Sequence, residues 1–254
     1  MPAPATAQVL FEARNLHKRF GDRVVLEDIS LAFAEGTTTG IIGPNGAGKT
    51  TCFNVLTGQF APDRGHVLMD GDDVTGFAPQ RLARRGVARS FQAITLFDQE
   101  TAQDNLVVAL PAVRARARSA WRDLARDTAA QDEAASILAR VGLAGRERTR
   151  ARDLSYGERR ALEIALALAT RPRILFLDEP TSGLGADGTA RLSDLVAELK
   201  RRFTMVIIEH DMRFLFGLAD RIHVIHWGQV IAGCTPDTLR DIPWVQRSSI
   251  GGAR

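Results

Sequence analysis

The sequence has few cysteines and no long apolar run. Its 254 residues include two cysteines, too few for a disulfide framework, which fits a reducing compartment. The longest unbroken apolar run covers residues 164–169, far short of the roughly 18 residues that a membrane-spanning helix needs. The N-terminus shows no basic start followed by an apolar run, so we expect no secretory signal. These absences predict a soluble protein of the cytosol, one that could still sit on a membrane partner.

The sequence also has little excess charge of either sign and very little lysine. The 33 basic and 30 acidic residues leave a net charge of +3, and only Lys18, Lys49 and Lys200 are lysines. A nucleic-acid binder would show a concentrated basic patch, so we predict no nucleic-acid partner. Hydrophobic residues make up 45% and charged residues 25%, which is ordinary for a globular chain with a sizeable core.

Strand-like and helical patterns alternate through much of the chain. Apolar runs at 174–177 and 205–208 predict strands that are buried on both faces of a parallel sheet. Residues 222–232 suggest a hairpin, and residues 93–155 are Ala- and Arg-rich and mostly helical in pattern. Strand–helix units imply an α/β fold with a largely parallel sheet, and the helical middle is expected to be an insertion into it.

A glycine-rich segment follows the strand predicted over residues 38–42. Residues 43–50, GPNGAGKT, fit the G-x-x-x-x-G-K-[ST] phosphate loop. Its glycines let backbone N–H groups converge on phosphate oxygens, and the next helix points its positive end at the same anion. Lys49 would reach the β- and γ-phosphates, and the Thr50 hydroxyl would bind Mg²⁺. The predicted nucleotide-binding residues here are Gly43, Pro44, Asn45, Gly46, Ala47, Gly48, Lys49, Thr50 and Thr51.

Two acidic residues directly follow the apolar run 174–177. An acid at the carboxyl end of a central parallel strand faces the crevice where ligands bind. Asp178 could therefore hold Mg²⁺ and Glu179 could polarise an attacking water. The alternative is an exposed acidic turn before Pro180.

The segment LSYGE at 154–158 admits two interpretations. Ser155 and Glu158 have the spacing of a capping box for a helix that runs to Ala169. A helix N-terminus with a serine and a glycine is also an anion site. Because both can be true at once, the residues alone leave the role of this segment open.

The phosphate loop, LSYGE, the ILFLDE strand and a histidine after the next strand occur here in the order and spacing of ABC transporter nucleotide-binding subunits. The chain resembles that family over nearly its whole length. The resemblance implies a P-loop NTPase core of RecA-like type with a mostly parallel sheet, an N-terminal antiparallel β part and an inserted α-helical subdomain. It implies one ATPase domain over 1–254, with the core at 1–92 and 161–254 and the helical subdomain at 93–160.

The resemblance also implies residue roles. Ser155 and Gly157 would bind the γ-phosphate of ATP held by a partner cassette, identical or different, in a head-to-tail dimer. Phe20 would stack on adenine. Gln92 would touch Mg²⁺ and the membrane subunit, and His210 would hold the γ-phosphate and orient Glu179 and water. The implied catalytic residues are Lys49, Gln92, Glu179 and His210, and the implied Mg²⁺ ligands are Thr50, Gln92 and Asp178.

Two features depart from the family pattern or are not explained by it. Gly185 occupies the usual aspartate position of the loop that crosses the dimer interface, so the side-chain contacts made there are lost. The segment 114–126 carries five arginines. It would form a solvated helix face, or else contact anionic lipid headgroups or an acidic partner.

Shorter runs indicate which transporter the cassette serves. IEHDM at 208–212, Phe91-Gln92 before Leu96-Phe97, and the Arg-rich insertion resemble the ATPases of branched-chain amino acid importers. This implies ATP and Mg²⁺ as cofactors, membrane permeases as partners with a periplasmic solute-binding protein acting indirectly, and a peripheral place on the cytoplasmic face of the inner membrane. The alternatives are an importer of urea or of another small amide or organic acid, and a lipid-exporting ABC ATPase.

Overall fold

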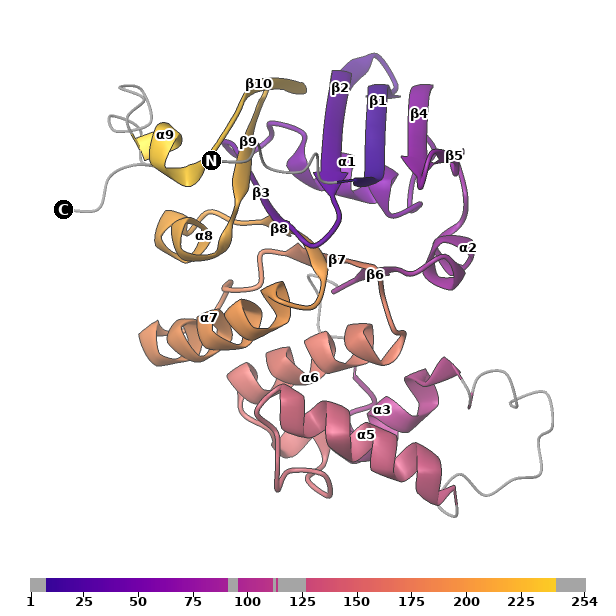
Figure 1. Cartoon of the computed structure of the whole chain (residues 1–254), viewed down its shortest axis with the longest axis vertical. Coiled ribbons are helices and arrows are strands. Elements are labelled where there is room, and N and C mark those ends of the chain that lie inside the picture. Colours follow the sequence, from indigo (N-terminus) through magenta and orange to yellow (C-terminus); the bar gives the residue numbers. More distant parts are fainter. Residues whose placement is uncertain (1–7, 91–95, 112, 114–126, 241–254) are drawn as a thin grey trace, which may run out of the picture.

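The structure, a computed structural model, describes residues 8–90, 96–111, 113 and 127–240 (Figure 1). Gln92 and the Arg-rich segment 114–126 lie outside the described residues, so the predictions for them stay predictions.

Two sheets form the upper body of the molecule in Figure 1. The first is antiparallel, with the strand order β2-β1-β4-β5, and comprises β1 (Val9–Phe20), β2 (Arg23–Ala34), β4 (Arg64–Met69) and β5 (Asp72–Asp73). The second has the order β10-β9-β3-β8-β7-β6 and comprises β3 (Thr38–Ile42), β6 (Val87–Arg89), β7 (Ile174–Asp178), β8 (Thr204–Ile208), β9 (Arg221–His226) and β10 (Gln229–Cys234). Its strands are parallel except for β10, which pairs with β9 as the predicted hairpin. The predicted fold class is confirmed.

The helices separate into those that pack on the sheets and those that pack together at the far end of the molecule. In Figure 1, α3, α5 and α6 gather at the end remote from the antiparallel sheet, with α7 next to α6. The helices are α1 (Lys49–Leu56), α2 (Pro79–Arg84), α3 (Ala102–Ala109), α5 (Thr128–Arg140), the 3₁₀ helix η2 (Ala151–Asp153), α6 (Tyr156–Ala169), α7 (Ala186–Lys200), α8 (Met212–Leu218) and α9 (Pro236–Arg240). Because α6 is continuous from Tyr156 to Ala169, the predicted domain boundary between residues 160 and 161 falls inside a helix.

The parallel sheet divides the apolar interior into two cores. Along β7, Phe176 belongs to the core shared with α1 and the antiparallel sheet, whereas its neighbours Leu175 and Leu177 belong to the core shared with the helices α3 to α8. Successive residues of a strand point to opposite faces, so a strand covered on both sides must be apolar throughout. The continuous apolar runs in the sequence reflect this double burial.

His223 on β9 is buried without a hydrogen-bond partner on either ring nitrogen among the described residues. Burial, helped by the charge of Arg221, lowers the pKa of His223 from 6.5 to about 4. Between these values the unfolded chain binds a proton that the folded chain does not, so folding stability falls as pH falls.

We expect His223→Phe to remove part of the acid sensitivity of the wild-type protein. The wild type should lose up to about 3 kcal/mol through this group from pH 7 to pH 4, and the variant should lose that much less. Urea unfolding at both pH values measures the difference. Equal losses of stability in the two proteins would contradict the assignment.

Candidate nucleotide site

Two of the three glycines of the phosphate loop, Gly43 and Gly48, lie where a side chain would collide with neighbouring backbone. A Cβ on Gly43 would come within 2.0 Å of the Ile225 carbonyl oxygen, and one on Gly48, at φ +102°, within 2.8 Å of the Val25 carbonyl oxygen. The loop is therefore fixed between β9 and β2, directly after β3. It leads into the N-terminus of α1, the end of a helix that attracts anions.

Lys49 is the first residue of α1, and its side chain folds back over the loop. Its Nζ donates to the carbonyl oxygens of Gly43 at 2.8 Å and Pro44 at 2.9 Å. Burial lowers the pKa of the Lys49 ammonium, while the carboxylates of Glu179 and Asp178 oppose that shift. Two neutral carbonyls are weaker partners for this cation than phosphate oxygens, so the arrangement suits Lys49 to an incoming polyphosphate.

A pocket of about 290 Å³ lies over the phosphate loop. It brings together residues from four separate parts of the chain: Phe20, Arg23, Val25, residues 45–51, Glu179 and His210. The Phe20 ring is 44% exposed and is backed by Phe60, whose ring packs edge-on at 5.3 Å. Sequence reasoning missed only Arg23 and Val25 in this lining. Phe20 and the phosphate loop thus share one cavity with Glu179 and His210, two predicted catalytic residues that come much later in the sequence.

Glu179 and His210 meet in the lining of this pocket. Glu179 Oε1 lies 2.8 Å from His210 Nε2, although the two residues are 31 positions apart. The backbone of Glu179 has a positive φ of 45°, which is uncommon for a residue with a side chain. The turn after β7 is therefore held in an unfavourable conformation that presents this carboxylate to the histidine.

The Asp178 carboxylate, buried at the end of β7, is paired with an arginine that the sequence analysis did not single out. Arg89 Nη2 lies 2.7 Å from Asp178 Oδ2, and Arg89 Nη1 donates to Asn54 Oδ1 and Thr57 Oγ1 at the end of α1. Arg89 ends β6, three residues before Gln92. Its position at the carboxyl end of β6 is the feature of the sequence that could have indicated a role at the site.

Glu209 is a second residue that the sequence analysis missed. Its buried carboxylate accepts hydrogen bonds from the Thr181 N–H at 2.7 Å and hydroxyl at 2.6 Å, and from the His210 N–H at 2.9 Å. It therefore ties the segment that carries His210 to the turn that follows Glu179. Glu209 directly follows β8, so the rule that selected Asp178, an acid at the end of a buried strand, would have found it.

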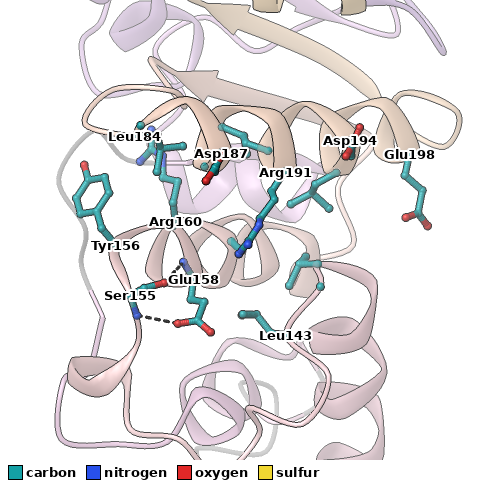
Figure 2. Close-up of a pocket in the computed structure, with 18 of the residues that line it drawn as sticks. Leu143, Ser155, Tyr156, Glu158, Arg160, Leu184, Asp187, Arg191, Asp194 and Glu198 are labelled. Atoms are coloured by element: carbon teal, nitrogen blue, oxygen red, sulfur yellow. Dashed lines mark hydrogen bonds between the residues drawn. The ribbon is translucent and has the colours of Figure 1, made fainter.

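Ser155 and Gly157 do not line this pocket. They lie at the start of α6, on a groove of about 740 Å³ between α5, α6 and α7 (Figure 2). Ser155 Oγ accepts from the Glu158 N–H at 3.3 Å, and Glu158 Oε2 accepts from the Ser155 N–H at 2.8 Å. The predicted capping box is confirmed, and it leaves the anion-binding interpretation untested.

Tyr156, the middle residue of the LSYGE signature segment (residues 154–158), contacts the loop that contains Gly185. The Tyr156 hydroxyl donates to the Ser182 carbonyl oxygen at 3.1 Å, and a Cβ on Gly183 would lie 2.9 Å from that hydroxyl. By contrast, a Cβ on Gly157 would meet nothing nearer than 3.8 Å, and one on Gly185 would meet nothing within 4 Å. No contact among the described residues therefore requires glycine at position 157.

The donor set at the pocket fits a magnesium ion that is bound jointly with a nucleotide. Mg²⁺ keeps several waters and takes one or two protein oxygens together with substrate phosphates. Thr50 lines the pocket. Asp178 lies outside that lining and pairs with Arg89, but it is close enough to influence the pKa of Lys49. Within the described part of the chain, no group of three or more His, Cys, Asp or Glu side chains could hold a metal ion without such a co-ligand.

Comparison with known proteins places this geometry in a family. Residues 26–182 match the ABC transporter family. The chain is 39% identical to the high-affinity branched-chain amino acid transport ATP-binding protein LivG of Salmonella typhimurium, covering 97% of this chain and all of the relative. It is 38% identical to the corresponding protein BraF of Pseudomonas aeruginosa, covering 96% and 98%. A third relative is the lipopolysaccharide export system ATP-binding protein LptB of Acidithiobacillus ferridurans, 33% identical over 95% and 97% of the two chains.

Solved structures agree with these matches. An ATP-binding cassette of an ABC transporter in its ADP conformation superposes with a TM-score of 0.85 at 28% identity, covering 96% of this chain and all of that one. A nucleotide-free cassette superposes with a TM-score of 0.83, also at 28% identity, covering 97% and 100%.

Proposed function

The chain belongs to the ABC transporter family and is an ATPase that powers transport, and we propose that its permease imports branched-chain amino acids. The proposal is supported by the names of the relatives. Identity is 39% and 38% to the two branched-chain amino acid transport proteins, against 33% to the lipopolysaccharide export protein. These matches cover almost the full length of each chain.

For the ATPase site, we propose that Lys49, His210 and the phosphate-loop N–H groups hold the β- and γ-phosphates of ATP while Glu179 activates water. The 2.8 Å contact between Glu179 and His210 beside the phosphate loop carries this proposal. Phe20 would stack on adenine. Mg²⁺, held by Thr50, Asp178 and Gln92, would neutralise charge on the phosphate oxygens. Glu179 would accept the proton of the attacking water, and the donors of the loop would stabilise the developing charge.

We propose further that two such cassettes pair head-to-tail. The observation in favour is the separation of Ser155 and Gly157 from the pocket of their own chain, together with the free space around Gly157. A second cassette would bring its serine and glycine to the phosphates held here, because a helix N-terminus with an unobstructed backbone attracts anions. The partner could be a second copy or a related subunit.

A second groove is proposed to face the permease. It has a volume of about 610 Å³ and lies between α2, β6 and α6, with apolar side chains such as Leu82 and Leu166 in its lining. The groove reaches Ser90, two residues before Gln92, so a permease segment seated there would lie beside the loop expected to sense the nucleotide.

Within the described residues no helix is long and apolar enough to cross a membrane. From the transport role of its relatives, we propose a peripheral subunit on the cytoplasmic face of the inner membrane, with a periplasmic binding protein delivering the solute to the permease.

The experiment that tests the proposal is uptake by a deletion strain of the source organism. We expect deletion to abolish ATP-dependent uptake of labelled leucine, and the wild-type gene to restore it. Lys49→Ala should not restore uptake, because loss of this charged contact lowers ATP affinity on the order of 10- to 100-fold. Lys200→Ala is the matched control and should restore uptake. It removes another lysine, which pairs with Asp220 just before β9 and does not line the nucleotide pocket.

Two outcomes would contradict parts of this proposal. Leucine uptake that survives deletion, with uptake of urea lost instead, would assign the cassette to the alternative importer. Full uptake with Lys49→Ala would show that transport does not depend on the predicted nucleotide site.

A further inference from the structure

Arg160 of helix α6 is buried, with 3% of its surface exposed, and its guanidinium reaches the turn that follows β7. Nη2 donates to the carbonyl oxygens of Asp178 at 2.9 Å and Glu179 at 3.0 Å, and Nε donates to that of Pro180 at 3.2 Å. One side chain thus binds three consecutive backbone carbonyls. Figure 2 shows Arg160 extending from α6 toward the segment that precedes α7.

Glu163, which pairs with the remaining nitrogen of this guanidinium, fixes its orientation. Arg160 Nη1 lies 2.8 Å from Glu163 Oε2, one helical turn further along α6, and both side chains are almost fully buried. The planar fork of an arginine has fixed donor directions. With Nη1 held by Glu163, Nε and Nη2 face the turn.

This arrangement is not explained by stability alone. A buried ion pair is often no more stable than apolar residues of the same volume, because both charges must be desolvated. What apolar residues cannot supply is three N–H groups directed at carbonyl oxygens. The turn needs such donors, since Glu179 has the positive φ of 45° that places its carboxylate beside His210, and a strained backbone persists only where its surroundings hold it.

We propose that Arg160 is a positioning residue for Glu179. It fixes the backbone on which the hydrolytic carboxylate stands and connects it to helix α6, whose first turn carries Ser155 and Gly157. This inference rests on the proposed role of Glu179. Arg160 does not line the nucleotide pocket, so we expect it to act on the rate of hydrolysis and to leave ATP binding unchanged.

Arg160→Lys tests the inference, because lysine keeps the charge beside Glu163 and loses the fork. We expect single-turnover hydrolysis to slow on the order of 10- to 100-fold, the scale of a small misplacement of a catalytic group, with ATP affinity unchanged. In a Glu179→Gln background the same substitution should slow hydrolysis almost no further, because no carboxylate remains to be positioned. Arg159→Lys is the matched control: Arg159 pairs with Asp98 and does not touch the turn, and this variant should hydrolyse ATP at the parent rate.

The combined variant Arg160→Met with Glu163→Leu removes both buried charges and guards against a folding defect of the single substitution. Because it leaves no unpaired buried charge, this variant should stay folded, which thermal unfolding checks, and its hydrolysis should be as slow as that of Arg160→Lys. A parent rate with Arg160→Lys, or the same fold-loss with and without the Glu179 carboxylate, would overturn the inference while leaving the role of Glu179 intact. A parent rate with Glu179→Gln alone would instead overturn the proposed role of Glu179, and this inference with it.

Discussion

Glu179→Gln should bind ATP as the wild-type protein does and hydrolyse it roughly 10²–10⁴ times more slowly, the usual loss when a positioned acid–base group is removed. Glutamine keeps the size of the side chain and can still hydrogen-bond to His210, which lies 2.8 Å away. It lacks the carboxylate that would accept the proton of water. Because neither binding nor dimer closure needs a base, the ATP-bound dimer should accumulate in the presence of Mg²⁺.

Two measurements check this expectation. Phosphate release gives the rate, and size-exclusion chromatography with ATP and Mg²⁺ detects the dimer. Glu198→Gln, the same chemical change on α7 and outside the nucleotide pocket, is the control and should keep the parent rate. A Glu179→Gln protein that turns over ATP normally and never shifts to dimer would move the role of base to another group, with His210 as the next candidate.

Ser155→Asp should abolish ATP hydrolysis while Ser155→Asn retains much of it. Aspartate and asparagine have nearly the same size, and both are good N-cap residues, so either can replace Ser155 Oγ as the acceptor of the Glu158 N–H. They differ in charge. If Ser155 faces the γ-phosphate held by a partner cassette, aspartate places a negative charge against that phosphate and opposes closure of the dimer. ATP binding by the separate chain should be the same in both variants, since the pocket of that chain does not contain Ser155.

Mixing two inactive variants adds a direct test of pairing between two copies. A Ser155→Asp chain retains an intact phosphate loop and a Lys49→Ala chain retains an intact signature segment, so a head-to-tail pair of the two contains one complete site. We expect the mixture to hydrolyse ATP although neither chain does so alone. Equal activity of the aspartate and asparagine variants would leave Ser155 as a helix cap only. A mixture that stays inactive would contradict pairing between identical chains.

The sequence by itself determined the elements that have a local physical cause. The phosphate loop was predictable because only glycine fits where Gly43 and Gly48 meet the backbone of β9 and β2. The buried strands were predictable because both their faces are covered, which makes every residue of 174–177 apolar. The start of α6 was predictable because Ser155 and Glu158 satisfy backbone N–H groups within one turn.

Only the tertiary structure decided which distant side chains meet. Arg160 is one charged residue among many in the sequence, and nothing in its neighbours reveals that it is buried. Arg89 and Glu209 stand at strand ends, but that position does not show which side chains they meet. They become significant because the parallel order of β6, β7 and β8 brings the carboxyl ends of those strands to one edge. At that edge the carbonyls and carboxylates of the turn after β7 require donors that the strands do not supply. A charged side chain that is buried is held in place by specific partners. Which side chains are buried depends on chain segments that are far apart in the sequence and pack together only in the fold.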